Sequence, residues 1–322
     1  MKTIKRKAAM LLLASFLVLS MLGLAACGKK STKDIVTAAT EKANNAKSMT
    51  YDIDMEMAMS IMGQEMTMKM YGSGEMINEP VQLSMIMNMD ISAAGNSQAN
   101  LMKIYATKED DDFVVYMGAG TGEDDISWSK TTEDASTLNQ YNARESLDIY
   151  VDAAESFKET ETEKINEKNA TKYEGVITGD AVNKVIQESG VMEQFASMGI
   201  DESMVETISN ISADIPLTLW ITEKDEEIVQ YRIDLTDYIT EFMKASMKDQ
   251  GVGSEDMFAL DITSMVETIT VTGYDNVSEI QIPDEALNAP ALDDYSDGSD
   301  TSDVSDVSAV PDIADEEPAL EE

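Results

Sequence analysis

Residues 49–91 read MTYDIDMEMAMSIMGQEMTMKMYGSGEMINEPVQLSMIMNMDI, and this stretch decides the fold. It holds twelve of the 24 methionines of the chain. Nine of the twelve form triplets at alternate positions, within residues 55–59, 66–70 and 85–89. A spacing of two is the side-chain period of a β-strand, so each triplet lies on one side of an extended segment. If the three strands are neighbours, the triplets form a single apolar patch.

That patch has to be covered. Burial of one methionine side chain contributes about 1.5–3 kcal/mol, so nine exposed methionines would forgo roughly 14–27 kcal/mol. The cover can be the protein's own helices, a lipid-like ligand or a soft metal ion. We therefore predict that the apolar residues of this stretch line a ligand cavity. They are Ile53, Met55, Met57, Met59, Met66, Met68, Met70, Leu83, Met85, Met87 and Met89.

The N-terminus is typical of a targeting signal. Lys2, Lys5, Arg6 and Lys7 precede the uncharged segment 8–26, which is rich in leucine and ends in small residues. Residues 1–26 are therefore predicted to be a signal peptide and residues 27–33 a short tether. The alternative is an uncleaved membrane helix, since 19 uncharged residues are just long enough to span a bilayer.

The charge of the chain excludes nucleic acid as a partner. Removal of residues 1–26 takes away four of the 23 basic residues and none of the 62 acidic ones, which leaves a net charge of −43. Such a surface repels nucleic acid and anionic lipid head groups. The chain also has no histidine and one cysteine, Cys27, so the usual nucleophilic triads and zinc sites are excluded. No enzyme class, cofactor or dedicated metal site is predicted.

The order of the predicted elements indicates an α+β fold. Ser31 and Asp34 have the spacing of a capping box, so a helix is predicted from there to about residue 47. A meander of antiparallel strands follows to residue 130, and helices and further strands alternate after it. We predict one domain over residues 34–289. Residues 290–322 are predicted to be a disordered acidic tail, because the last 32 residues hold twelve acidic residues and no basic one.

Several finer predictions follow the same patterns. Gly72 and Gly74 are expected to weaken their strand and to mark a bulge. A helical period covers residues 138–157, and single strands are predicted over residues 164–178 and 277–282. Asp237 is expected to cap a further helix.

The chain resembles LolA-like bacterial lipoproteins, the superfamily of lipoprotein carriers and of the LppX/LprG type of lipid-binding lipoprotein. The resemblance rests on a lipobox, Leu24-Ala25-Ala26-Cys27, on the helix near Asp34, on the strand that contains Trp128, and on the ending Ile280-Gln281-Ile282-Pro283-Asp284-Glu285-Ala286. It implies diacylglyceryl transfer to Cys27, anchoring on the outer face of a cell membrane, and the Gram-positive branch of the superfamily. It further implies a large curved antiparallel sheet, a half-barrel wrapped around helices, with an apolar cavity and no enzymatic activity.

Three functions fit these observations. The first is binding or carriage of a hydrophobic, lipid-like molecule in a cavity lined by methionine, a side chain flexible enough to adapt to ligand shape. The second is an interaction or sensor module whose methionine patch is filled by its own helices. The third is binding of Cu(I), because thioethers are soft ligands. The sequence names neither the ligand nor a protein partner.

Overall fold

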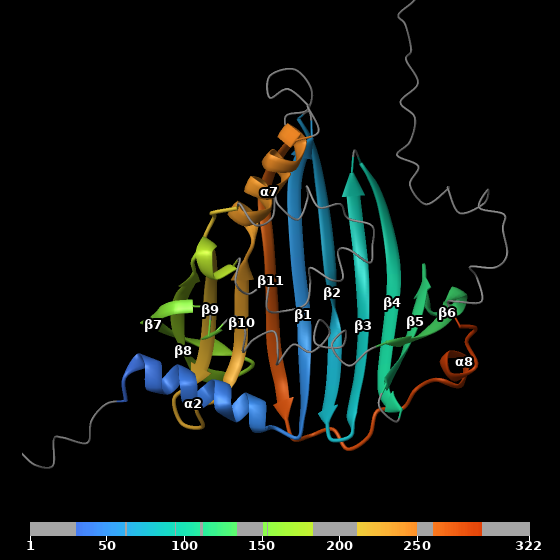
Figure 1. Ribbon diagram of the computed structural model, residues 1–322, viewed down its shortest axis with the longest axis horizontal. Helices are drawn as coiled ribbons and strands as arrows, with labels where there is room; N and C mark the ends of the chain where they lie inside the picture. Colours follow the sequence, from blue (N-terminus) through green and yellow to red (C-terminus); the bar gives the residue numbers. More distant parts are fainter. Residues whose placement is uncertain are drawn as a thin grey trace, which may run out of the picture.

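The computed structural model describes residues 30–61, 63–93, 95–109, 112–133, 151–152, 154–182, 211–249 and 260–291. Its centre is one sheet of eleven strands in the order β6-β5-β4-β3-β2-β1-β11-β10-β9-β8-β7 (Figure 1). Every pair of neighbouring strands is antiparallel, and the two edge strands, β6 and β7, do not pair with each other. The predicted α+β class and the large antiparallel sheet are confirmed, and the sheet is open rather than closed.

The strands follow the sequence as a meander on each side of the central pair β1 and β11. They are β1 (Ser48–Ile61), β2 (Gln64–Asn78), β3 (Val81–Ala93), β4 (Asn96–Glu109), β5 (Asp112–Gly120), β6 (Ser127–Glu133), β7 (Ala154–Ile165), β8 (Lys168–Ile177), β9 (Ile215–Thr222), β10 (Ile228–Asp234) and β11 (Leu260–Tyr274). The turn between β1 and β2 contains Gly63 at a φ of 79°, and the turn between β3 and β4 contains Gly95 at 84°. Glycine adopts this left-handed backbone without a steric penalty, which suits such tight connections.

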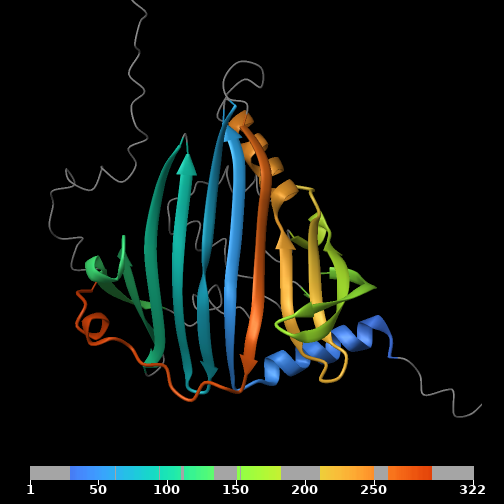
Figure 2. The same ribbon diagram turned by 180° about the vertical axis from the view of Figure 1, so that it is seen from behind.

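Two helices lie on the same side of the sheet. Helix α2 (Thr32–Asn45) crosses one end of the strands, and α7 (Thr236–Asp249) lies beside the other end of β11 (Figures 1 and 2). The predicted capping box is present, because the Ser31 hydroxyl accepts from the Asp34 amide at 3.2 Å and the Asp34 carboxylate accepts from the Ser31 amide at 3.2 Å. Val36 and Ala39 of α2 are buried in the main core, and Ile239 and Phe242 of α7 pack against it.

The opposite side of the sheet is covered at one corner by the segment that follows β11. Ile280 and Ala286, the latter in the short helix α8 (Asp284–Leu287), are buried with Tyr105 and Tyr116 of β4 and β5. Residues 277–282 do not form the predicted strand. The Val277 amide donates to the Ser48 hydroxyl at 3.0 Å and the Ile280 amide donates to Gln82 Oε1 at 3.4 Å, so side chains take the place of a neighbouring strand.

Two other predictions need correction. Residues 154–157 belong to β7 and not to a helix, while residues 134–150 lie outside the described part of the chain. The single strand predicted over residues 164–178 is a hairpin of β7 and β8, because Asn166 and Glu167 both have positive φ, at 46° and 65°. Two consecutive residues of positive φ make the type of turn that reverses an antiparallel pair.

The start of α7 also differs from the prediction. The helix begins at Thr236, and Asp234 caps it, since its carboxylate accepts from the Thr236 amide at 3.2 Å and from the Thr236 hydroxyl at 2.6 Å. Asp237 lies in the first turn of the helix, where a negative charge is favoured by the helix dipole.

Candidate ligand-binding face

The register of the central strands brings the methionine triplets together. Met55, Met57 and Met59 of β1 lie directly opposite Met70, Met68 and Met66 of β2. Met70 lies in turn opposite Met89 of β3. Directly paired residues in an antiparallel sheet point to the same side, with Cβ atoms about 4.5–5.5 Å apart. The three triplets therefore occupy one face.

The other predicted residues occupy this face as well. Ile53 lies opposite Gly72, which lies opposite Met87, and Met85 lies opposite Gly74. Leu83 lies opposite Met76, so all eleven predicted residues project to the side that carries α2 and α7. We call this side of β1, β2, β3, β4, β9, β10 and β11 the methionine face. Its other methionines, which the sequence analysis did not single out, are Met49, Met76, Met102 and Met265.

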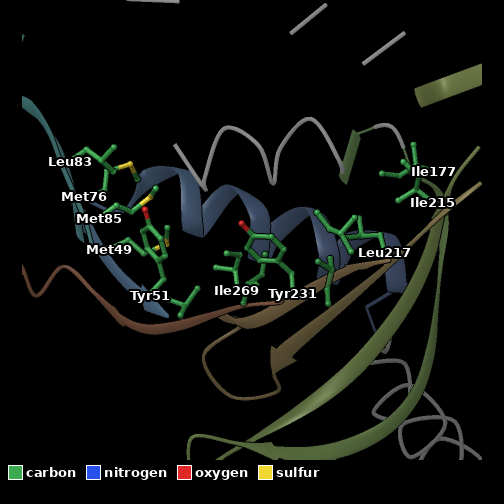
Figure 3. Close-up of a cluster of buried hydrophobic side chains, with 14 of the residues drawn as sticks. Met49, Tyr51, Met76, Leu83, Met85, Ile177, Ile215, Leu217, Tyr231 and Ile269 are labelled. Atoms are coloured by element: carbon green, nitrogen blue, oxygen red, sulfur yellow. The ribbon is translucent and has the colours of Figure 1, made fainter. Parts of the chain in front are cut away.

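Burial of the methionine face changes along the strands. At the end near α2, Tyr51, Met76, Leu83, Met85 and Met87 are 1–8% exposed. Towards the other end, Ile53 and the remaining seven predicted methionines are half-buried. Figure 3 shows the buried end, where Tyr51, Ile269, Tyr231 and Leu217 lie between the sheet and α2. The face is thus part core and part accessible apolar surface.

The two glycines of β2 explain how the buried end packs. No register shift interrupts the pairing of β2 with β1 or β3, so the predicted bulge at Gly72 and Gly74 is absent. Gly74 lies opposite Tyr51, and a Cβ at Gly74 would come within 2.3 Å of the tyrosine ring. The glycine therefore makes room for the ring.

The hydroxyl of Tyr51 is buried and makes no hydrogen bond within the described structure. Burial alone raises the pKa of this phenol far above its usual value of 10. The same cause, helped by Glu241, raises the pKa of Tyr238 on α7 to about 12. Both phenols therefore remain protonated near neutral pH.

One acidic side chain departs from the apolar character of the methionine face. Glu267 of β11 lies opposite Met55 on one side and Ile233 of β10 on the other. Burial raises the pKa of its carboxyl above the usual 4.5, and no charged neighbour offsets this effect. Sequence analysis did not single out Glu267. The alternation Met265, Glu267, Ile269 and Val271 is the signal that places it among inward-facing residues.

The other acidic residues of the central strands lie on the opposite face. Asp52, Asp54 and Glu56 alternate with the methionines of β1, and Asp52 and Asp54 are exposed. Glu56 forms an ion pair with Lys69 at 3.4 Å on that face. Within the described residues, no group of three or more histidine, cysteine, aspartate and glutamate side chains is arranged to hold a metal ion.

The predicted anchor cannot be placed in the structure. Cys27 and the predicted signal peptide, residues 1–26, lie outside the described residues. Within the part of the chain that is described, no helix is long and apolar enough to cross a membrane.

Comparison with solved structures finds similar folds at low sequence identity. The Mycobacterium tuberculosis lipoprotein LppX is 10% identical, with a TM-score of 0.41 over 77% of this chain and 97% of its own. LprF from Mycobacterium bovis is 12% identical, with a TM-score of 0.42 over 79% and 96% of the two chains. A DUF1329 family protein from Desulfovibrio piger is 9% identical, with a TM-score of 0.21 over 76% and 92%.

LppX belongs to the group of lipoproteins that the sequence resembles. No curated protein matches it. A family model does match, over residues 31–291. The chain belongs to this family, which is described as a family of unknown function (DUF6612).

Proposed function

We propose that this protein is a lipoprotein, anchored through diacylglyceryl-Cys27 to the outer face of the cell membrane, that binds a hydrophobic, lipid-like ligand on the methionine face. The observation that carries the proposal is the common orientation of the three triplets, in which seven of the nine methionines are half-buried. A row of half-buried thioethers makes apolar contact with a ligand, and the flexible methionine side chains can adapt to the shape of that ligand. The proposed function is binding of the ligand without catalysis.

The distribution of charge supports an apolar ligand. The acidic residues of β1 and β2 lie on the opposite face, so the sheet separates a charged surface from an apolar one. Contiguous apolar surface of this kind on a protein that lives in water marks a binding site more often than it marks simple exposure. The buried end, beneath α2, supplies the stable core that such a site needs.

The test is native mass spectrometry of the mature chain, from position 27 onward, with Cys27→Ser so that no detergent is needed. We expect the protein to carry lipid from the cells in which it is made, or to take up diacylglycerol from vesicles. Protein that is empty after purification and takes up no lipid would contradict the proposal.

A matched pair of variants locates the site. Met57→Glu places a charge on the methionine face, and Ala58→Glu places the same charge on the opposite face one residue later. A carboxylate in contact with an apolar ligand loses its hydration, so we expect Met57→Glu to weaken lipid binding by roughly tenfold or more. Ala58→Glu should bind as the parent does. Equal binding by both variants, each with a parental melting temperature, would place the ligand elsewhere.

A further inference from the structure

Glu267 is an exception in the charge pattern of the strands around it. The described strands β1, β2, β3, β9, β10 and β11 direct many side chains to the methionine face, and among these Glu267 alone carries a charge. The chain has 62 acidic residues, and the other acidic residues of these six strands lie on the opposite face. Glu267 is half-buried, and a carboxylate that is partly removed from water without a charged partner is unfavourable for folding, so its place in an apolar surface calls for a functional reason.

Among the described residues, Glu267 has no polar partner beside it. Its cross-strand neighbours are Met55 and Ile233, and its neighbours along β11 on the same face are Met265 and Ile269. No hydrogen bond or ion pair joins Glu267 to another described residue. The nearest basic residue of β10, Arg232, lies on the opposite face and pairs with Asp234 at 3.3 Å.

Glu267 also stands at the end of a row of thioethers. Met55, Met70 and Met89 continue the row across β1, β2 and β3, each directly opposite the one before. Neighbouring strands are about 4.8 Å apart, so the row extends about 14 Å from the carboxyl group. A polar group at one end of an apolar row is complementary to an amphiphile, which has a polar head group at one end of a hydrocarbon chain.

We propose that Glu267 receives the head group of the ligand, that this head group is a protonated amine, and that the hydrocarbon chain lies along the methionine row. The inference rests on the proposed function and names its ligand class. A cationic N–H donor gives the carboxylate the charge-assisted hydrogen bond that it lacks, whereas an anionic head group would be repelled by it. The strongly acidic surface of the mature chain favours the same sign of ligand.

Three probes of equal chain length test the proposal on the mature chain with Cys27→Ser: dodecylamine, dodecanol and dodecanoate, used below their critical micelle concentrations. We expect dodecylamine to bind roughly tenfold to a hundredfold more tightly than dodecanoate, the ratio given by one charged hydrogen bond. Glu267→Gln should remove most of this preference. Glu75→Gln, which removes one charge from the opposite face of β2, should leave it unchanged.

A second test measures the binding preference as a function of pH, and it needs no variant at position 267. Protonation of Glu267 removes the charge that attracts the amine, so the preference for dodecylamine should fall as the pH drops through the raised pKa of this carboxyl. The titratable residues of helix α7, which packs beside β11, are Asp237, Tyr238, Glu241, Lys244, Lys248 and Asp249. Glu241 accepts from the amide and hydroxyl of Ser212, both at 3.2 Å. The proposed head-group contact is made by Glu267 and by no residue of α7. The variants Asp237→Asn and Lys244→Gln should therefore keep the pH dependence of the parent.

The outcomes separate this inference from the proposed function. If all three probes bind equally well to the parent and to Glu267→Gln, the head-group assignment is wrong and the apolar site stands. If dodecanoate binds most tightly, the assignment is likewise wrong. If none of the probes binds and no lipid is taken up, both the assignment and the proposed function fail.

Discussion

At the scale of single residues, the packing of the methionine face depends on positions where the sequence is compatible with two local structures. Gly74 is such a position. A glycine inside a strand commonly marks a bulge, but here the strand is regular and the missing side chain admits the Tyr51 ring from the next strand. The pair joins β1 and β2 at the buried end, where the ring is 1% exposed.

Substitution at Gly74 tests this contact. A Cβ there would lie 2.3 Å from the ring, so Gly74→Ala forces the Tyr51 side chain or the strand to move, and we expect a loss of roughly 1–3 kcal/mol in the free energy of unfolding. Gly122→Ala is the control, because its only neighbour within 4 Å is an Asp125 oxygen at 3.9 Å. Urea denaturation measures both. Equal stability of the two variants would mean that the ring does not require the glycine.

At the scale of the strand, the unit of the site is the cross-strand row rather than the single methionine. Met265, Met57 and Met68 form one such row across β11, β1 and β2. Because every residue opposite another shares its side, a shift of one residue in the register of β1 would move all its methionines to the charged face. The alternation with Asp52, Asp54 and Glu56 therefore specifies the register as well as the face.

Conversion of a whole triplet to leucine distinguishes apolar packing from metal binding. For apolar packing, Met55→Leu, Met57→Leu and Met59→Leu together should change the free energy of unfolding by less than about 1.5 kcal/mol per site and leave lipid uptake within a few fold. Leucine has no thioether, so Ag(I), a stand-in for Cu(I), should bind the parent and the triple variant equally weakly. Tight Ag(I) binding that the variant loses would favour the metal function instead.

At the scale of the molecule, the sheet divides the protein into an apolar side that carries α2 and α7 and an acidic side. The acidic side suits a protein in water, and the other side combines the core with the proposed ligand site. The predicted anchor precedes α2, which crosses one end of the methionine face (Figure 1). Anchoring through two acyl chains would keep that face close to a source of lipid.

The mode of anchoring has its own test. Cys27→Ala removes the only thiol to which a diacylglyceryl group can be attached, so the protein should shift from the detergent phase to the aqueous phase in detergent phase separation, or remain as the unprocessed precursor without acyl groups. Labelling with a radioactive fatty acid should show incorporation into the parent and into Gly28→Ala only. Equal labelling of Cys27→Ala would contradict lipidation at this position.

The sequence alone determined the central strands β1, β2 and β3 and the common side to which their alternate residues point. Successive side chains of a strand point to opposite faces, so a segment that alternates methionine with acidic residues has one apolar face and one charged face. This property is local and does not depend on which strands are its neighbours. The same holds for the cap of α2, since Ser31 and Asp34 are three residues apart. Local patterns were less reliable where tertiary pairing competes with them, as at Phe157, which is opposite Gly175 in a strand.

Only the tertiary structure decided which strands are neighbours and what the faces contain. β1 pairs with β11 across more than two hundred residues, and no local pattern specifies such a partner. That pairing places Met265 beside Met57 and Glu267 beside Met55, and so puts one carboxyl group into an apolar row. In a chain with 62 acidic residues, the composition cannot mark Glu267 as different from the rest; its neighbours across the sheet can.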